Sequence, residues 1–154
     1  MPSSPVYATF RPRATRAVSI GLATATIGGG VFLLIVLSSL RTVHTADTVT
    51  IVVMAAGICA ILYRQWSVRA VPTPQGLTVR NFFLTRTLEW AEIVSVRFGD
   101  GGPWVQLDLA DGTVHAVMAI QRSDGAYARA ESRRLATLVA AHEGRGVDPG
   151  GTGG

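Results

Sequence analysis

The chain has 154 residues, a mean hydropathy of +0.34 and a hydrophobic content of 48%. It is too apolar for an ordinary soluble domain of this size and too polar to lie wholly in a membrane, so it must be divided into two parts. The net charge is +4, but residues 67–154 carry nine Arg against nine acidic residues. The excess positive charge lies near the first apolar stretch, which argues against a nucleic-acid footprint.

Residues 1–17 combine three prolines with serine and arginine, so no periodic apolar face can form. The composition predicts a short, mostly flexible cytoplasmic tail, in which Tyr7 and Phe10 at most touch the membrane interface. A cleaved signal peptide is the alternative. The apolar stretch that follows is longer than a signal peptide requires, and no convincing cleavage site follows it.

The first long apolar stretch covers residues 18–40 and contains no charged side chain. At about 1.5 Å per residue it forms a helix of roughly 34 Å, enough to cross a hydrocarbon core of about 30 Å. A second stretch, residues 48–66, is shorter. It recovers about 20 residues if it is extended to Ala46 with Asp47 near the headgroups and if Arg64 extends its guanidinium to the headgroups. Only residues 41–47 connect the two, so the sequence predicts a transmembrane helical hairpin with a short extracytoplasmic loop.

Arginines are distributed unequally around these two stretches. Five flank the outer ends of the hairpin, whereas the short loop carries one Arg and one Asp. Because positive charge is retained on the cytoplasmic side, both termini are expected in the cytoplasm and the protein in the plasma (inner) membrane. The flanking arginines are Arg11, Arg13, Arg16, Arg64 and Arg69.

Small residues recur at four-residue spacing on both predicted helices. They are Gly21, Ala25 and Gly29 in the first helix, and Ala56 and Ala60 in the second. Such faces let helix backbones approach closely in lipid. We expect them to pack the two helices of the hairpin together; the alternative is that they bind a partner helix or a second copy of the chain.

Beyond Trp66 the apolar residues alternate with a period of two, which indicates β-strands. Turn residues divide this region into six short strands, and Asp111-Gly112 is typical of a tight hairpin. The order predicts a meander of antiparallel strands, each with one buried face.

The alternation also predicts which side chains point into the core. Trp90 shares its parity with Leu88, so its indole is expected inside, close to the terminal helix. His115 is expected to point outward. The next strand should meet Trp90 through Val94, Val96 and Phe98.

The last predicted element is a helix that ends at Gly144, followed by a disordered Gly-rich tail, residues 144–154. Ser123 or Asp124 can cap it, and its apolar side should cover the open end of the sheet. That side consists of Tyr127, Leu135, Leu138, Val139 and His142.

Three side chains of this domain are candidate contacts for a partner. Trp104 is expected on the outer face beside a Gly-rich loop, and Arg129 and Arg133 give the helix a basic side. The alternative for the two arginines is a solvated face, and Glu131 is expected to pair with Arg134.

A resemblance to a known family rests on the order of the chain's segments. Two apolar spans are followed by the strand Gly76–Arg80, then by Arg86 and by Trp90-Ala91-Glu92-Ile93. The chain resembles actinobacterial membrane proteins with a bacterial pleckstrin-homology (PH) domain, the family of the low-molecular-weight protein antigen 6. The resemblance covers roughly residues 66–143, which with the helix end gives a predicted domain of residues 67–143. It implies a PH-like split β-barrel of six or seven antiparallel strands capped by a C-terminal helix.

Homologues that bind phosphoinositides grip phosphate with basic residues around the first hairpin. Here that hairpin, residues 71–76, carries no charge, so specific phosphoinositide binding is not expected. Arg80 and Arg86 follow, but two arginines on a small sheet are more often solvated partners of nearby acids.

The sequence contains no catalytic or metal constellation. The three histidines, His44, His115 and His142, are widely separated, and the single Cys59 lies in an apolar stretch as a packing residue. We therefore expect no cofactor and no enzymatic activity. The leading hypothesis is a membrane protein that presents a PH-like interaction or scaffolding domain at the cytoplasmic surface; the alternative is an accessory subunit or assembly factor of a larger membrane complex.

Overall fold

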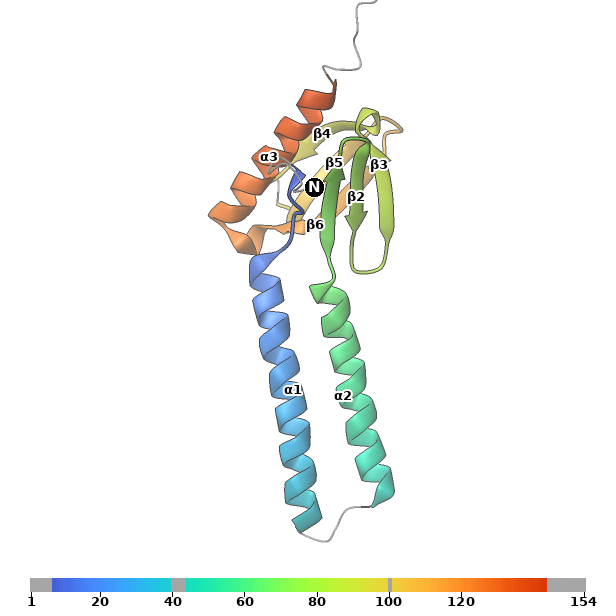
Figure 1. The fold of residues 1–154 in the computed structure, drawn as a ribbon, viewed down its shortest axis with the longest axis vertical. Helices are drawn as coiled ribbons and strands as arrows, with labels where there is room; N and C mark the ends of the chain where they lie inside the picture. Colours follow the sequence, from blue (N-terminus) through green and yellow to red (C-terminus); the bar gives the residue numbers. More distant parts are fainter. Residues whose placement is uncertain (1–6, 40–43, 100, 144–154) are drawn as a thin grey trace, which may run out of the picture. The chain divides into compact units, whose positions relative to one another are not determined.

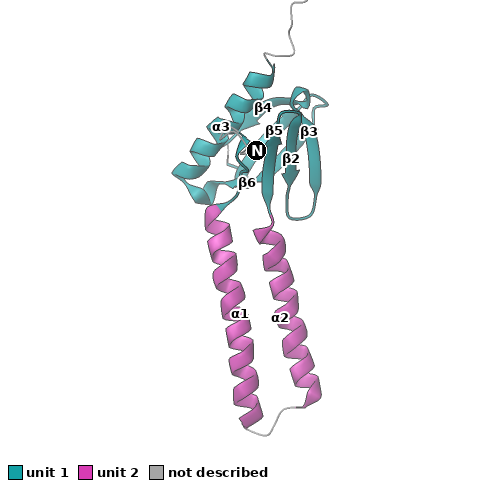
Figure 2. Ribbon diagram, viewed as in Figure 1, with its two compact units in different colours: residues 1–12, 68–154 teal, residues 13–67 magenta. Residues whose placement is uncertain are grey.

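The computed structural model describes residues 7–39, 44–99 and 101–143 (Figure 1). The chain forms two compact units, a helical hairpin of residues 13–67 and a domain built from residues 1–12 and 68–154 (Figure 2). The predicted Gly-rich tail and residues 41–43 of the predicted 41–47 loop lie outside the described residues.

The hairpin consists of α1 (Arg13–Ser39) and α2 (Thr45–Trp66). Both helices begin earlier than the predicted spans. Helix α1 starts directly after Pro12. Proline has no backbone N–H, so it could not donate the hydrogen bond that an earlier helical turn would need. At the start of α2, the Asp47 carboxylate accepts a 3.0 Å hydrogen bond from the backbone N–H of His44, and its charge favours the helix N-terminus.

The two helices meet along a stripe different from the predicted small-residue faces. A Cβ atom on Gly30 would lie 3.9 Å from Cγ2 of Ile51, whereas one on Gly21 or Gly29 would meet no atom within 4 Å. Ala25, Ala56 and Ala60 are also exposed. A side chain at Gly21 or Gly29 would thus not meet the second helix, whereas Ala56 lines a hollow together with Gly30 and Leu34 of α1. Packing through these small residues, within the hairpin or with another helix or a second copy, stays a prediction. The least exposed stripe of α1 is Ser19, Ala23, Thr26, Gly30, Leu34 and Leu37.

The domain contains two antiparallel three-stranded sheets and a C-terminal helix, which confirms the predicted fold class. The first sheet has the order β1 (Arg69–Thr73), β2 (Gly76–Arg80), β3 (Thr85–Glu89). A 3₁₀ turn, η2 (Trp90–Glu92), leads into the second sheet, β4 (Ile93–Arg97), β5 (Trp104–Leu109), β6 (Val114–Gln121). A second 3₁₀ turn, η3 (Arg122–Asp124), precedes α3 (Ala126–Glu143).

The side chain of Asn81 joins the two sheets. Its Nδ2 donates to the carbonyl of Ala116 at 2.7 Å, and its Oδ1 accepts from the N–H of Met118 at 3.0 Å. The amide thus reproduces the paired hydrogen bonds of a β-ladder between the end of β2 and β6.

The core lies between the two sheets and α3. Gly76 is required where β2 and β3 come closest, because a Cβ atom there would collide with the carbonyl oxygen of Leu88. Trp90 is buried as predicted, and its Nε1 donates to the carbonyl of Thr73 at 2.9 Å. The largest fully buried side chains are Phe10, Leu77, Leu88, Ile93, Leu107, Ile120 and Leu135.

The predicted inner faces of β4 and β6 need correction. The register shifts between Ile93 and Ser95, so Ile93 is buried and Val94 is 56% exposed, although Val96 and Phe98 pack on the core as expected. Such a bulge changes which residues face inward.

In β6 the predicted parity is reversed. Val117 is fully buried and Val114 is exposed. His115 lies opposite Leu107 on the inner face, and its buried Nε2 has no hydrogen-bond partner among the described residues. Residues that face each other across two strands share one face, so the hairpin register decides this parity.

The segment before the hairpin belongs to the domain rather than to a flexible tail. Phe10 and Ala70 form an antiparallel bridge in which each N–H donates to the other carbonyl, at 2.8 and 3.1 Å. The Phe10 ring is fully buried, and the guanidinium of Arg134 lies 3.9 Å from its centroid. The N-terminal segment, blue in Figure 1, therefore extends the edge of β1 next to α3.

Helix α3 begins after Gly125, whose φ of 57° reverses the chain direction. The carbonyl of Gly125 accepts the N–H of Arg129, so Gly125 occupies the position that the sequence assigned to Ser123 or Asp124. The buried stripe includes Leu135, Leu138 and Val139 as predicted, with Ala128 and Ser132 in addition.

Candidate functional site

A groove between β4 and α3 is the main candidate site of the domain. It encloses about 470 Å³ and runs from the end of β4 along the outer side of α3. We call it the α3–β4 groove. Its lining consists of Val96, Phe98, Gly99, Arg122, Gly125, Arg129, Ser132, Arg133 and Ala136.

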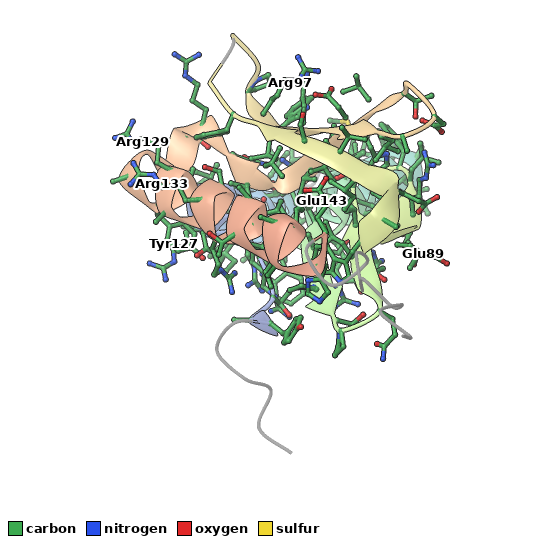
Figure 3. The ribbon with its side chains drawn as sticks, turned by 90° about the horizontal axis from the view of Figure 1, so that it is seen from above. Glu89, Arg97, Tyr127, Arg129, Arg133 and Glu143 are labelled. Carbon is green, nitrogen blue, oxygen red and sulfur yellow. The ribbon has the colours of Figure 1, made fainter. Side chains whose placement is uncertain are left out.

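The helical repeat explains why these residues of α3 form one wall. Positions three or four apart lie on one face of a helix, and Arg129, Arg133 and Ala136 follow this spacing. Figure 3 shows Arg129 and Arg133 side by side at the same end of α3. The 3₁₀ turn η3 adds Arg122 to this wall, because its N–H is fixed by a 2.8 Å bond to the carbonyl of Pro103.

In the described part of the domain, no acidic side chain pairs with the arginines of this wall, Arg122, Arg129 and Arg133. Elsewhere in the domain Arg134 pairs with Glu131 at 2.7 Å, as predicted, and Arg97 pairs with Asp108 at 2.6 Å.

The pair formed by Arg97 and Asp108 illustrates what an arginine does to a neighbouring acid. Hydrogen bonds from Arg97 and then from Ser95 lower the pKa of Asp108 below its usual value. A carboxylate in the α3–β4 groove would meet three guanidiniums, which form the strongest hydrogen bonds with bidentate oxyanions.

The opposite wall of the groove is apolar. Val96 and Phe98 are half-buried and present their exposed sides to the groove. In the described part of the chain, β4 is an edge strand that pairs only with β5. Such an edge can accept hydrogen bonds from an added extended segment.

The structure brings together two of the three predicted contact residues. Arg129 and Arg133 line the groove, whereas Trp104 is half-buried at the start of β5 and does not line it. Sequence reasoning missed Arg122 and the apolar wall, because only the folded topology places the end of β6 and β4 beside α3. One indication of Arg122 was present in the sequence, namely its position four residues before the first residue of α3.

Other chemistry is not evident in the described ranges. No group of three or more His, Cys, Asp or Glu side chains that could hold a metal ion occurs there. Burial, and then the charge of Arg86, lower the pKa of His115 below 6.5, and this histidine lies apart from the groove.

Similarity to known proteins identifies the class to which this fold belongs. Residues 67–137 match the family described as Bacterial PH domain. The chain is 32% identical over 131 residues to uncharacterized protein Rv1417 of Mycobacterium tuberculosis and to uncharacterized protein Mb1452 of Mycobacterium bovis. Each match covers 85% of this chain and 84% of the relative. The chain therefore belongs to the same family as these mycobacterial relatives, and its residues 67–137 match the bacterial PH domain. No solved structure matches it significantly.

Proposed function

We propose that the chain is a membrane-anchored binding protein, not an enzyme, whose α3–β4 groove holds an acidic segment of a protein partner at the cytoplasmic surface. The observation that carries this proposal is the cluster of three arginines without a carboxylate partner in the described residues, facing an apolar wall. It requires no cofactor.

Membrane insertion is supported by the outer faces of the hairpin. Both helices are long enough and apolar enough to cross a membrane. Many of their large apolar side chains are exposed; Phe32 is 69% exposed and Val53 is 65% exposed. Such surfaces are more stable in lipid than in water.

An orientation with both ends of the hairpin on one side is supported by the bridge between Phe10 and Ala70. These residues flank the hairpin and hydrogen-bond to each other, so they must lie on the same side of a membrane. The surplus of arginine at these ends favours the cytoplasm of the inner membrane. Reporter fusions after Met1, at His44 and after Gly154 test this: only the fusion at His44 should be active outside, and outside activity at Gly154 would contradict it.

The groove is tested with the full chain in zwitterionic nanodiscs. The ligand is a dye-labelled peptide of alternating glutamate and leucine, and the matched control has lysine in place of glutamate. Fluorescence anisotropy should detect binding of the acidic peptide only, weakened by added salt. Arg129→Glu with Arg133→Glu should raise its Kd at least about tenfold, since each charge-assisted bond contributes about 1.5–3 kcal/mol.

The control variant Arg11→Glu changes the net charge at an exposed position of the same domain. It should bind the acidic peptide as the parent does. Equal binding of both peptides, or equal loss in Arg11→Glu, would show that the groove does not select an acidic segment. A photocrosslinker at Ala136, which lines the groove, then captures the cellular partner, with the exposed Ala140 as the control position.

A second candidate function is that of an accessory subunit or assembly factor in a larger membrane complex. It is favoured by the outward position of the small-residue faces, which leaves them accessible to a partner helix or a second copy. Co-purification in mild detergent separates the two functions, because a subunit should stay with its complex at a fixed ratio.

We also propose that the chain belongs to the low-molecular-weight protein antigen 6 family. This assignment rests on the sequence motif from Gly76 to Ile93.

A further inference from the structure

The loop between β2 and β3 carries the most exposed apolar side chains of the domain. Phe83 is 80% exposed and Leu84 is 69% exposed. The ring of Phe82 packs edge-on against the ring of Phe83, with the two ring centroids 4.6 Å apart. We call residues 82–84 the apolar tip. Two adjacent large side chains held in water are unfavourable, so an apolar tip of this kind indicates a contact surface.

The apolar tip is held rigidly. The N–H of Asn81 donates to the carbonyl of Leu84 at 2.8 Å and closes the turn. The side chain of Asn81 is bound to β6 at Ala116 and Met118, so the base of the loop is fixed to both sheets. Phe83 and Leu84 are therefore presented outward by the fold rather than by a loose segment.

The apolar tip lies at the end of the sheet where the chain enters from the hairpin. Arg80, the last residue of β2, is the register partner of Arg69, the first residue of β1. Arg69 follows Trp66, the last residue of α2, by three positions, a distance of at most about 11 Å even when extended. Neighbouring strands are about 4.8 Å apart, so the tip lies at the same end of the sheet as the first residue of β1.

Two arginines stand directly behind the tip. Arg69 and Arg80 face each other across the strand pair, an arrangement that is unfavourable without an anion between them. No carboxylate in the described ranges pairs with either, whereas Arg86 lies 3.9 Å from Asp111. The two arginines line a hollow of about 290 Å³ together with Val71, Thr78 and Thr85.

We propose that the apolar tip inserts into the headgroup region of the leaflet from which α2 emerges, while Arg69 and Arg80 bind lipid phosphate. An apolar tip backed by basic side chains matches the chemistry of a phospholipid surface, apolar chains below and phosphate above. This second membrane contact orients the domain and rests on the membrane insertion proposed above.

The test uses the full chain in nanodiscs that contain a spin-labelled lipid as a fluorescence quencher. The native Cys59 in α2 is replaced by Ala, and a thiol-reactive dye is attached to Phe83→Cys. The matched control is Val94→Cys, another exposed apolar position, which follows η2 at the opposite end of the first sheet. We expect strong quenching at position 83 and little at position 94.

The lipid composition tests the two arginines. Quenching at position 83 should be stronger with phosphatidylglycerol than with phosphatidylcholine alone. Each of Arg69→Gln and Arg80→Gln should lower the ratio of docked to free domain about fivefold, the value of one basic residue at an anionic surface. Arg86→Gln, with its own acidic partner, should have a smaller effect.

Dye on the native Cys59 separates this inference from the membrane proposal. Quenching at Cys59 without quenching at position 83 would overturn the inference and leave the inserted hairpin intact, and the tip would then be assigned to a protein partner. Equal quenching at positions 83 and 94 would also overturn it. No quenching at Cys59 would overturn membrane insertion and the inference together.

Discussion

The indole of Trp90 lies nearly parallel to the imidazole of His142, with ring centroids 4.6 Å apart and an angle of 17° between the planes. The Leu138 carbonyl, which can only accept, lies 2.8 Å from Nδ1 of His142, so in the neutral ring Nδ1 carries the proton. Nε2 then accepts from the hydroxyl of Tyr7 at 3.2 Å. One histidine thus connects η2, α3 and the N-terminal segment.

Trp90→Ala should lower the stability of the domain far more than Trp104→Ala. Removing the buried indole leaves a cavity, which costs roughly 3–5 kcal/mol. Trp104 is half-buried, so its removal should cost about 1–2 kcal/mol. Thermal unfolding of the full chain in detergent measures both, and the opposite order would contradict the assignment of the two faces.

Phe10→Ala should destabilise the domain although Phe10 precedes the hairpin in sequence. The ring is fully buried beneath the Arg134 guanidinium, so the expected loss is again roughly 3–5 kcal/mol. The control Arg11→Ala changes the exposed neighbour and should unfold at the temperature of the parent. An isolated fragment of residues 67–143 should show the same weakness, because it lacks this ring.

Asn81→Ala should uncouple the two sheets. It leaves the carbonyl of Ala116 and the N–H of Met118 without their partner, which costs about 1–3 kcal/mol for each group shielded from water. Thr87→Ala is the control, because it removes a hydrogen bond to Thr78 on the exposed face of a single sheet. Denaturant titration should separate the two variants, and equal midpoints would refute the bridging role of Asn81.

Acid should destabilise the domain through His115. Burial and the charge of Arg86 lower its pKa below 6.5, so the unfolded chain binds a proton more readily than the folded one. The contribution to stability is complete above pH 6.5 and is lost as the pH falls through the lowered pKa. In His115→Gln the melting temperature should fall less on going from about pH 7.5 to about pH 5. Identical pH profiles would contradict this, and Asp108, with its lowered pKa, contributes only in more acidic solution.

The alternation of apolar residues was sufficient to predict the six strands, and a one-sided apolar face that ends at Gly144 predicted the terminal helix. It failed for the faces of β4 and β6 for local reasons. The bulge at Ile93 shifts one strand, and in β6 apolar residues occupy both parities, so only the register of Leu107 with His115 decides which face is inside. The turn between β5 and β6 sets this register, because the N–H of Leu109 donates a hydrogen bond to the carbonyl of Thr113 there.

The contribution of Phe10 could not be predicted, because its partner Ala70 lies beyond the whole hairpin in sequence. The candidate site was predictable in part. Arg129 and Arg133 follow from helical spacing, but the apolar wall of Val96 and Phe98 is brought to them only by the order of the second sheet.

If the hairpin spans a membrane as proposed above, the bridge between Phe10 and Ala70 makes completion of the domain depend on integration of both helices. Phe10 leaves the ribosome before either helix and must wait until the strand with Ala70 has been translated. If only one helix were integrated, the two residues would be on opposite sides of the bilayer and the domain would lack a core ring. Such a chain would expose apolar surface to proteases, so misinserted copies would be removed by ordinary quality control without a dedicated receptor.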